Sequence, residues 1–111
     1  MRQFRILVVT SFSLVLLATL FGCAGTTAAM EHYDRGIDYF DEGHFDEAIA
    51  EFTEAIELDP ELALAYANRG FAYATKGELD SAIADLDKVI EVSTNPDLIQ
   101  AAREAIIVLE G

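Results

Sequence analysis

A repeat of 34 residues constrains this chain more than any other feature of its sequence. When the sequence is shifted by 34 places, identical residues coincide: Arg35 with Arg69, Gly36 with Gly70, Tyr39 with Tyr73, Gly43 with Gly77, Asp46 with Asp80, and Ala48, Ile49 and Ala50 with Ala82, Ile83 and Ala84. The same step carries Arg69 to Arg103 and Gly77 to Gly111, so the register continues into a third, incomplete unit. A period of this length without β-rich segments predicts helical hairpins that stack on one another.

Within each unit the apolar residues recur at the spacing of an α-helix. In the first unit the residues at i, i+3, i+4, i+7, i+10 and i+11 are Phe45, Ala48, Ile49, Phe52, Ala55 and Ile56, with acidic residues opposite them. Gly43 and Gly77 can adopt the positive φ that ends a helix, and the residues before Pro60 and Pro96 leave the α region. We therefore predict five helices, over residues 29–42, 45–58, 61–76, 79–92 and 96–109.

The pattern of small and large residues resembles the tetratricopeptide repeat. The first unit has the family's signature residues at Gly36, Tyr39, Ala48, Phe52, Ala55 and Pro60. The second unit has Tyr66, Gly70, Tyr73, Ala82 and Leu86. The resemblance implies an all-α superhelix of two helical hairpins, residues 29–62 and 63–96, followed by a capping helix over 97–111. In this last helix Glu104 stands in place of the tight-packing glycine.

The first 22 residues have the pattern of an export signal. Arg2 and Arg5 precede fifteen mostly apolar residues from Ile6 to Leu20, fewer than the ~20 that a helix needs to cross a bilayer. The next residues, through Cys23, complete the sequence Leu-Phe-Gly-Cys, which resembles the lipobox of bacterial lipoproteins. In that family the cysteine thiol takes a diacylglycerol and becomes the first residue after cleavage. The alternative is an uncleaved signal anchor with an incidental thiol.

This second resemblance implies a location. It divides the start of the chain into a signal peptide over 1–22 and a short tether of small residues over 23–28, with lipid on Cys23. The residue after the cysteine is Ala24, so the chain lacks the aspartate at this position that resembles an inner-membrane retention signal. We therefore expect an exported domain that is lipid-anchored in the cell envelope, at the periplasmic face of the outer membrane if the cell has two membranes.

The composition excludes several classes of function. Seven Lys and Arg against twenty Asp and Glu give a formal charge of −13, and without Arg2 and Arg5 the balance is 5 − 20 = −15. Such a surface repels phosphates, so we expect no nucleic-acid partner. A single cysteine excludes an internal disulfide, and His32 and His44 alone do not make a metal site. We expect no metal, no cofactor and no catalysis.

Any function is expected in the concave groove of the array. In tetratricopeptide arrays the first helices of successive hairpins hold an extended or helical peptide. Carried over position by position, the groove of the first unit consists of Met30, Tyr33, Ile37, Phe40 and Asp41. That of the second unit consists of Leu64, Ala67, Phe71, Ala74 and Thr75. Some members grip a terminal carboxylate with cationic and amide side chains; apolar and acidic residues at these faces instead predict an apolar protein or peptide partner with basic flanks.

Several alternatives stay open at this point. Tyr33, Ile37 and Phe40 can instead pack against one another or against the capping helix. The whole protein can be an envelope adaptor of the kind that serves in secretion, pilus or cell-wall assembly, a self-associating structural lipoprotein that forms a homo-oligomer, or a non-catalytic subunit of an envelope enzyme complex. Each arginine of a repeated set is expected to pair with a nearby acid across its hairpin, and the alternative is that the set forms a small basic strip along the array; the set is Arg35, Arg69 and Arg103.

Overall fold

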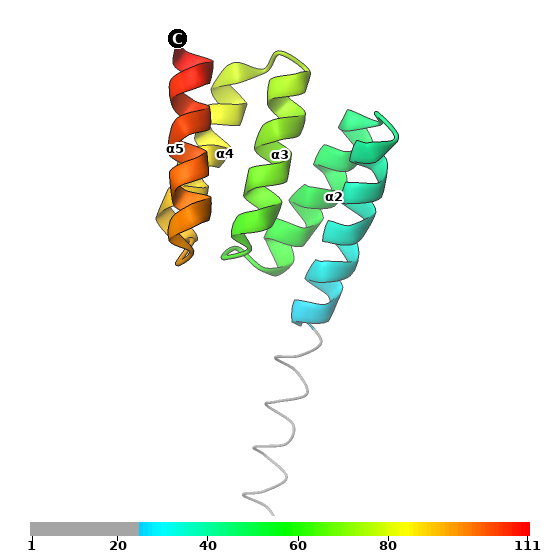
Figure 1. Ribbon diagram of the computed structural model, residues 1–111. Helices are drawn as coiled ribbons and strands as arrows, with labels where there is room; N and C mark the ends of the chain where they lie inside the picture. The colour runs from blue at the N-terminus through cyan, green and yellow to red at the C-terminus, as the bar shows by residue number, and fades with distance from the viewer. Residues whose placement is uncertain (1–24) are drawn as a thin grey trace, which may run out of the picture.

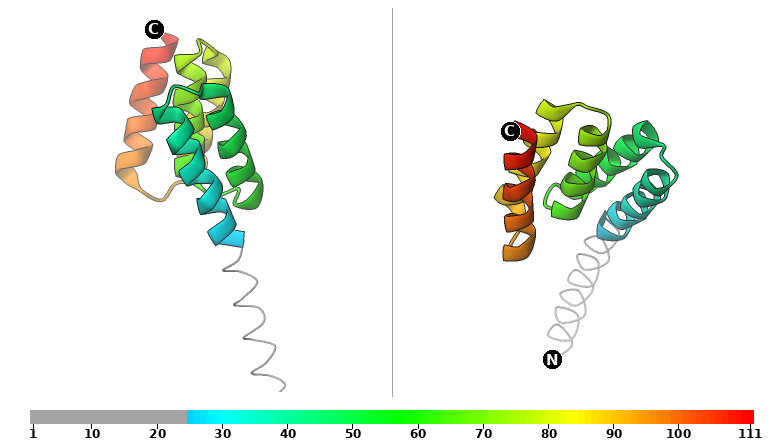
Figure 2. Two further views of the ribbon diagram at one scale, coloured as in Figure 1. Left: turned by 90° about the vertical axis from the view of Figure 1, so that its right-hand side faces the viewer. Right: turned by 45° about the horizontal axis from the view of Figure 1, so that its top comes forward.

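The computed structural model describes residues 25–111, which form five α-helices (Figure 1). The first described helix covers residues 25–41, and it is followed by α2 (Phe45–Leu58), α3 (Ala63–Thr75), α4 (Leu79–Val92) and α5 (Pro96–Glu110). Consecutive helices run antiparallel and form one curved row, with the first helix and α5 at its two ends (Figures 1 and 2). The predicted all-α helical-repeat architecture is confirmed.

The observed helix boundaries follow the sequence prediction closely. Helices α2 and α4 have the predicted limits, and α5 extends one residue beyond its predicted end. Helix α3 begins at Ala63 rather than at residue 61 because a side-chain oxygen of Asp59 accepts a hydrogen bond of 3.1 Å from the backbone N–H of Glu61, which holds Pro60 and Glu61 in a turn.

The start of the first helix differs from the prediction. Residues 25–28, which the sequence analysis assigned to a short tether, are already helical. Ala29 is completely buried, so the helix is fixed by packing immediately after this segment, and Ala28 has the best intrinsic helix propensity. Cys23 and the predicted signal peptide lie outside the described residues. None of the helices within 25–111 combines the length and the apolar character needed to cross a membrane.

The turns have the chemistry that the sequence indicated. Gly43 and Gly77 have φ values of 81° and 82°, a left-handed conformation that other residues adopt only with strain. Asn95 caps α5, because its side-chain oxygen accepts hydrogen bonds from the backbone N–H groups of Asp97 at 2.9 Å and Leu98 at 3.4 Å. Pro96 then occupies the first turn, where no backbone donor is required.

Close helix approach explains the repeated glycines. A Cβ atom added to Gly36 would lie 2.5 Å from the ring of Phe52, which is completely buried between the first helix and its neighbours. A Cβ atom added to Gly70 would lie 3.3 Å from both the carbonyl oxygen of Ala82 and the Cβ of Asp85. The hairpins therefore pack helix against helix at contacts that only small residues allow.

Helix α5 packs against α3 and α4 and covers that end of the described core. A cluster of buried residues joins α3, α4 and α5; its members are Tyr66, Ala67, Leu86, Val89 and Ala102. On the exposed side of α5, Gln100 Nε2 donates a 3.0 Å hydrogen bond to Glu104 Oε1. Glu104 occupies the position of Gly36 and Gly70 in the repeat, so a further helix could not approach α5 as closely as the earlier helices approach one another. The assignment of this segment as a capping helix stays a prediction.

Candidate functional site

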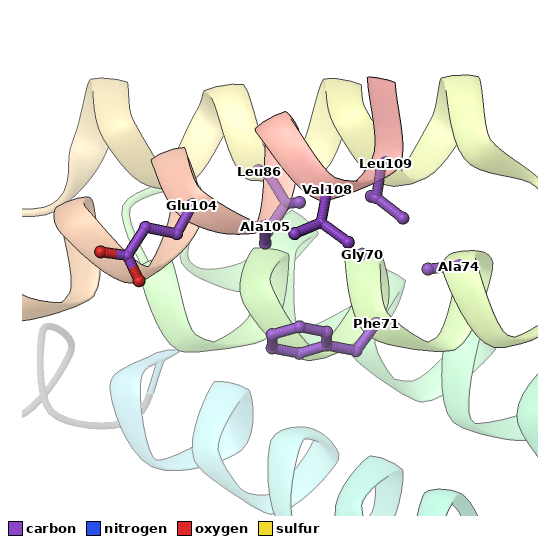
Figure 3. Close-up of a pocket in the computed structure, with 8 residues that line it drawn as sticks. All are labelled: Gly70, Phe71, Ala74, Leu86, Glu104, Ala105, Val108 and Leu109. Atoms are coloured by element: carbon purple, nitrogen blue, oxygen red, sulfur yellow. The ribbon is translucent and has the colours of Figure 1, made fainter. Parts of the chain in front are cut away.

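A cavity of about 270 Å³ lies between α3 and α5 and is lined almost entirely by apolar side chains. Its lining consists of Gly70, Phe71 and Ala74 from α3, Leu86 from α4, and Glu104, Ala105, Val108 and Leu109 from α5. Figure 3 shows Val108 and Leu109 directed from α5 toward α3, on the side of the molecule where Phe71 and Ala74 lie. The cavity is open to solvent, so another molecule can reach it.

The hollow exists because small residues stand where α3 and α5 come together. Gly70, Ala74 and Ala105 leave space that the larger neighbours do not fill. Phe71 is 47% exposed and Val108 is 77% exposed, although both side chains are apolar. The exposed apolar side chains around this hollow, on an otherwise acidic surface, make it the candidate site of the described array.

Two of the eight residues that line the cavity belong to the groove predicted from the sequence, and six do not. Phe71 and Ala74 belong to the predicted groove of the second unit. The 34-residue step carries the five groove positions of that unit to the third, at Leu98, Ala101, Ala105, Val108 and Leu109, and the last three of these line the cavity. The sequence analysis gave α5 only a capping role and did not continue the groove into it. The signal was present, because the same step relates Arg69 to Arg103.

The remaining groove positions of the second unit are dispersed. Leu64 is 45% exposed and does not line the cavity. Ala67 is buried in the core cluster, where Val89 and Ala102 surround it, so it offers a partner no accessible surface. Thr75 is exposed and its hydroxyl donates to the carbonyl oxygen of Phe71 at 2.8 Å.

Two of the five groove positions of the first unit, Tyr33 and Phe40, pack against neighbouring aromatic rings. Tyr33 is half-buried, its ring centroid lies 5.9 Å from that of Phe52, and its hydroxyl oxygen accepts a 2.9 Å hydrogen bond from Asn68 Nδ2. Phe40 packs edge-on against Phe45 at 5.3 Å. The other three, Met30, Ile37 and Asp41, are exposed or half-buried and stand apart from the cavity.

The contact between Tyr33 and Asn68 joins the two hairpins and changes the chemistry of the phenol. Burial raises the pKa of Tyr33 above its ordinary value, because the phenolate loses hydration. The hydrogen bond from Asn68 acts in the opposite direction and lowers this pKa, and the charge of Asp34 raises it further. The phenol therefore stays protonated and serves as a structural contact.

Arg69 is committed to the framework rather than to the groove. Its Nε and Nη2 donate to the two carboxylate oxygens of Asp85 at 2.8 and 2.7 Å, and Nη1 donates to Thr53 Oγ1 at 3.0 Å. Its guanidinium also lies 5.8 and 5.9 Å from the ring centroids of Tyr66 and Tyr73. The hydrogen bonds to Asp85 raise the pKa of Arg69. Arg69 therefore makes the acidic pairing that the sequence analysis expected.

The first hairpin has a weaker version of this pair. Glu51 is the counterpart of Asp85 in the 34-residue repeat, and its Oε2 lies 3.9 Å from Arg35 Nε. The same oxygen lies 2.7 Å from His32 Nδ1, so His32 provides the closer contact. His32 therefore takes up the carboxylate that Arg35 reaches only at longer range.

The only charged side chain that lines the cavity is acidic, and nearby lysines are engaged elsewhere. Lys76 Nζ lies 2.5 Å from Asp46 and 2.9 Å from Glu78, and Lys88 Nζ lies 2.8 Å from Glu91. The lining contains no basic side chain, and its one ionisable group is the carboxylate of Glu104. Among residues 25–111, no cluster of His, Cys, Asp and Glu is arranged to hold a metal ion.

Comparison with known protein families places these helices in a repeat family. A family model described as "TPR repeat" matches residues 36–77, and a second, described as "Tetratricopeptide repeat", matches residues 63–96. The chain carries tetratricopeptide repeats. The matched residues of this tetratricopeptide array extend from the first helix to the start of α5, and they include the α3 side of the cavity. A search of curated protein sequences found no match.

Solved structures with similar folds carry the same repeats. The array is similar to the first TPR of Spaghetti (RPAP3) bound to the HSP90 peptide SRMEEVD, with 24% identity, a TM-score of 0.70, and coverage of 76% of this chain and 68% of that chain. It is also similar to the second TPR of the same protein bound to the same peptide, with 29% identity, a TM-score of 0.69, and coverage of 78% and 80%.

Proposed function

We propose that this protein is a non-catalytic adaptor whose tetratricopeptide array binds a segment of another protein, with the cavity between α3 and α5 as the principal contact. The observation that carries the proposal is the pair of exposed apolar side chains, Phe71 and Val108, at one hollow. Burying one large apolar side chain of a partner there contributes about 1.5–3 kcal/mol. The similar array in Spaghetti is a peptide-binding structure, which supports the same class of partner.

The chemistry of the groove favours a different peptide from that of the relatives. The peptide SRMEEVD carries three acidic side chains, whereas this array has no basic residue in the cavity lining. The side-chain amide nitrogen of Asn68 already donates to the Tyr33 hydroxyl and to the carbonyl oxygen of Leu64. These features support a partner segment that is apolar and has basic flanks.

The location of the adaptor is a second part of the proposal. Arg2 and Arg5, the apolar stretch after them and the sequence ending at Cys23 support export and lipid modification in a bacterial cell envelope. Stable anchoring requires two or more acyl chains, which a lipoprotein modification supplies. Ala24 favours the periplasmic face of the outer membrane in a cell with two membranes. Mass spectrometry of the mature protein tests this: we expect a chain that begins at lipid-modified Cys23, and Cys23→Ser should abolish the modification.

Crosslinking in intact cells, followed by purification of the protein, tests the adaptor function. We expect one specific envelope protein to be recovered with the natural protein and to be lost with Phe71→Glu and with Val108→Glu. Ile107→Glu is the matched control, because Ile107 neighbours Val108 on α5, is 67% exposed and does not line the cavity. Recovery of the same protein with all four chains would contradict the proposal.

A second copy of the chain is the alternative occupant of this surface, as a structural lipoprotein would require. Ile107 and Val108 give α5 an exposed apolar corner that supports this alternative. Light scattering of the purified mature protein distinguishes the two. An adaptor has the mass of one chain in the absence of its partner, whereas a structural lipoprotein has a multiple of that mass which Val108→Glu reduces.

A further inference from the structure

Glu104 places one negative charge at an otherwise apolar cavity. It lines the cavity together with Ala105 and Val108, and Figure 3 shows its side chain at one end of the lining, with the carboxylate directed away from the other labelled side chains. Its Oε1 accepts one hydrogen bond, from Gln100 Nε2 at 3.0 Å, and a carboxylate can accept several. Glu104 is exposed, so the remaining acceptor positions face solvent and are accessible to a ligand.

No neighbouring cation of the described array satisfies this carboxylate. Residues 25–111 contain five Lys and Arg residues against twenty Asp and Glu residues. Arg69, Lys76 and Lys88 are bound to other carboxylates at 2.9 Å or less, and Arg35 lies 3.9 Å from Glu51. The fifth, Arg103, precedes Glu104 in the chain and is exposed, but the described residues show no ion pair between the two. The negative charge of Glu104 is therefore available to complement a positive charge on a partner.

The size of the cavity limits what enters beside that cation. Sites for small molecules and cofactors commonly measure ~300–1,000 Å³, so a cavity of about 270 Å³ lies just below that range. Such a volume suits a single large aliphatic or aromatic side chain. The apolar walls from Phe71, Leu86 and Val108 match that chemistry.

We propose that Glu104 is a specificity-determining residue: the partner segment inserts one large apolar side chain between α3 and α5 and places a lysine or arginine side chain against the Glu104 carboxylate. This inference rests on the proposed function and specifies the ligand of the same site. Both side chains must project from the same face of the partner. The cation is therefore two residues from the apolar anchor in an extended segment and three or four residues from it in a helix.

Selection of peptides from a random display library tests the proposal. The target is the mature protein in lipid nanodiscs, and sequences that bind empty nanodiscs are removed. We expect the natural protein to enrich peptides with a large apolar residue and a lysine or arginine at one of these separations. Glu104→Lys should abolish the preference for basic residues and favour acidic ones. Glu110→Lys is the matched control, because it makes the same charge change at an exposed position of α5 outside the cavity lining.

The affinity of one selected peptide provides the second measurement. Glu104→Gln should weaken its binding roughly two- to fivefold and should flatten its dependence on salt, as expected for loss of one exposed ion pair. A preference for basic residues that persists in Glu104→Lys would overturn the role of Glu104 while leaving the proposed function intact. Failure of the natural protein to enrich any peptide beyond the Val108→Glu variant would instead overturn the proposed function.

Discussion

Arg69 holds both carboxylate oxygens of Asp85, at 2.8 and 2.7 Å, and thereby ties α3 to α4. The side chains of Arg69 and Asp85 are only 17% and 6% exposed, so each would be left as an uncompensated, poorly hydrated charge without the other. The additional hydrogen bond from Arg69 to Thr53 extends the connection to α2. One guanidinium group therefore links the two hairpins of the array.

Removing one member of this pair should destabilise the array strongly. We expect Asp85→Ala to lower the free energy of unfolding by about 3–5 kcal/mol, because the buried guanidinium keeps its charge and loses its partner. Arg35→Ala is the control, because Arg35 is 53% exposed and stands 3.9 Å from Glu51, and it should cost no more than about 1 kcal/mol. Urea unfolding followed by far-ultraviolet circular dichroism measures both. Equal losses from the two variants would contradict the assigned role of Asp85.

The two repeated glycines should respond differently to the same substitution. Gly36→Ala places a methyl group 2.5 Å from the ring of Phe52, so we expect a loss of about 1–3 kcal/mol of stability from overpacking. Gly70→Ala meets its nearest atoms at 3.3 Å, and the gain in helix propensity of about 0.5–1 kcal/mol offsets much of that strain. Thermal unfolding should therefore show a lower midpoint for Gly36→Ala than for Gly70→Ala. The reverse order would be inconsistent with the packing described.

Loss of the cap at Asn95 should weaken α5 and the cavity that α5 completes. Asn95→Ala removes the acceptor for the Asp97 and Leu98 N–H groups, and we expect a loss of about 1 kcal/mol. Asn95→Asp retains an acceptor and should preserve stability. Hydrogen exchange measured by mass spectrometry should show faster exchange in the first turn of α5 for Asn95→Ala. Unchanged exchange in that turn would show that the cap does not stabilise it.

Tyr33 should make the array sensitive to alkaline pH. Its folded-state pKa is raised above the ordinary value of 10.0, so its contribution to stability is complete below that pH and is lost as pH rises through the folded pKa. An absorbance titration at the phenolate band should contain a late step that Tyr33→Phe removes. If Tyr33→Phe removes instead a step at the ordinary tyrosine pKa, the effect of burial on Tyr33 is absent.

The helices could be predicted well from the sequence because the residues that start and end them act locally. Gly43 and Gly77 each adopt the left-handed conformation of a helix-ending turn. Asn95 and Pro96 together start α5, because Asn95 caps its first turn and Pro96 occupies it. The start of α3 was missed because it depends on a side-chain hydrogen bond from Glu61 to Asp59, which competes with an additional helical turn. Local residue preferences therefore located the elements to within a few residues.

The candidate site was harder to predict because a cavity is the space that side chains leave between helices. Ala74 and Ala105 are far apart in the sequence, and nothing in their spacing shows that α5 leaves a gap beside α3. The repeat step still identifies Val108 as a groove position once α5 is treated as a first helix rather than as a cap. The depth of the hollow follows from tertiary packing against Leu86, which periodicity does not describe.

The position of Glu104 has a consequence for how this protein can evolve. Adding another hairpin after α5 would require a small residue at this place, as at Gly36 and Gly70. That replacement would also remove the single negative charge from the lining of the cavity. Under our proposal for Glu104, an array extended in this way would lose its preference for a basic side chain, so repeat number and choice of partner would be coupled.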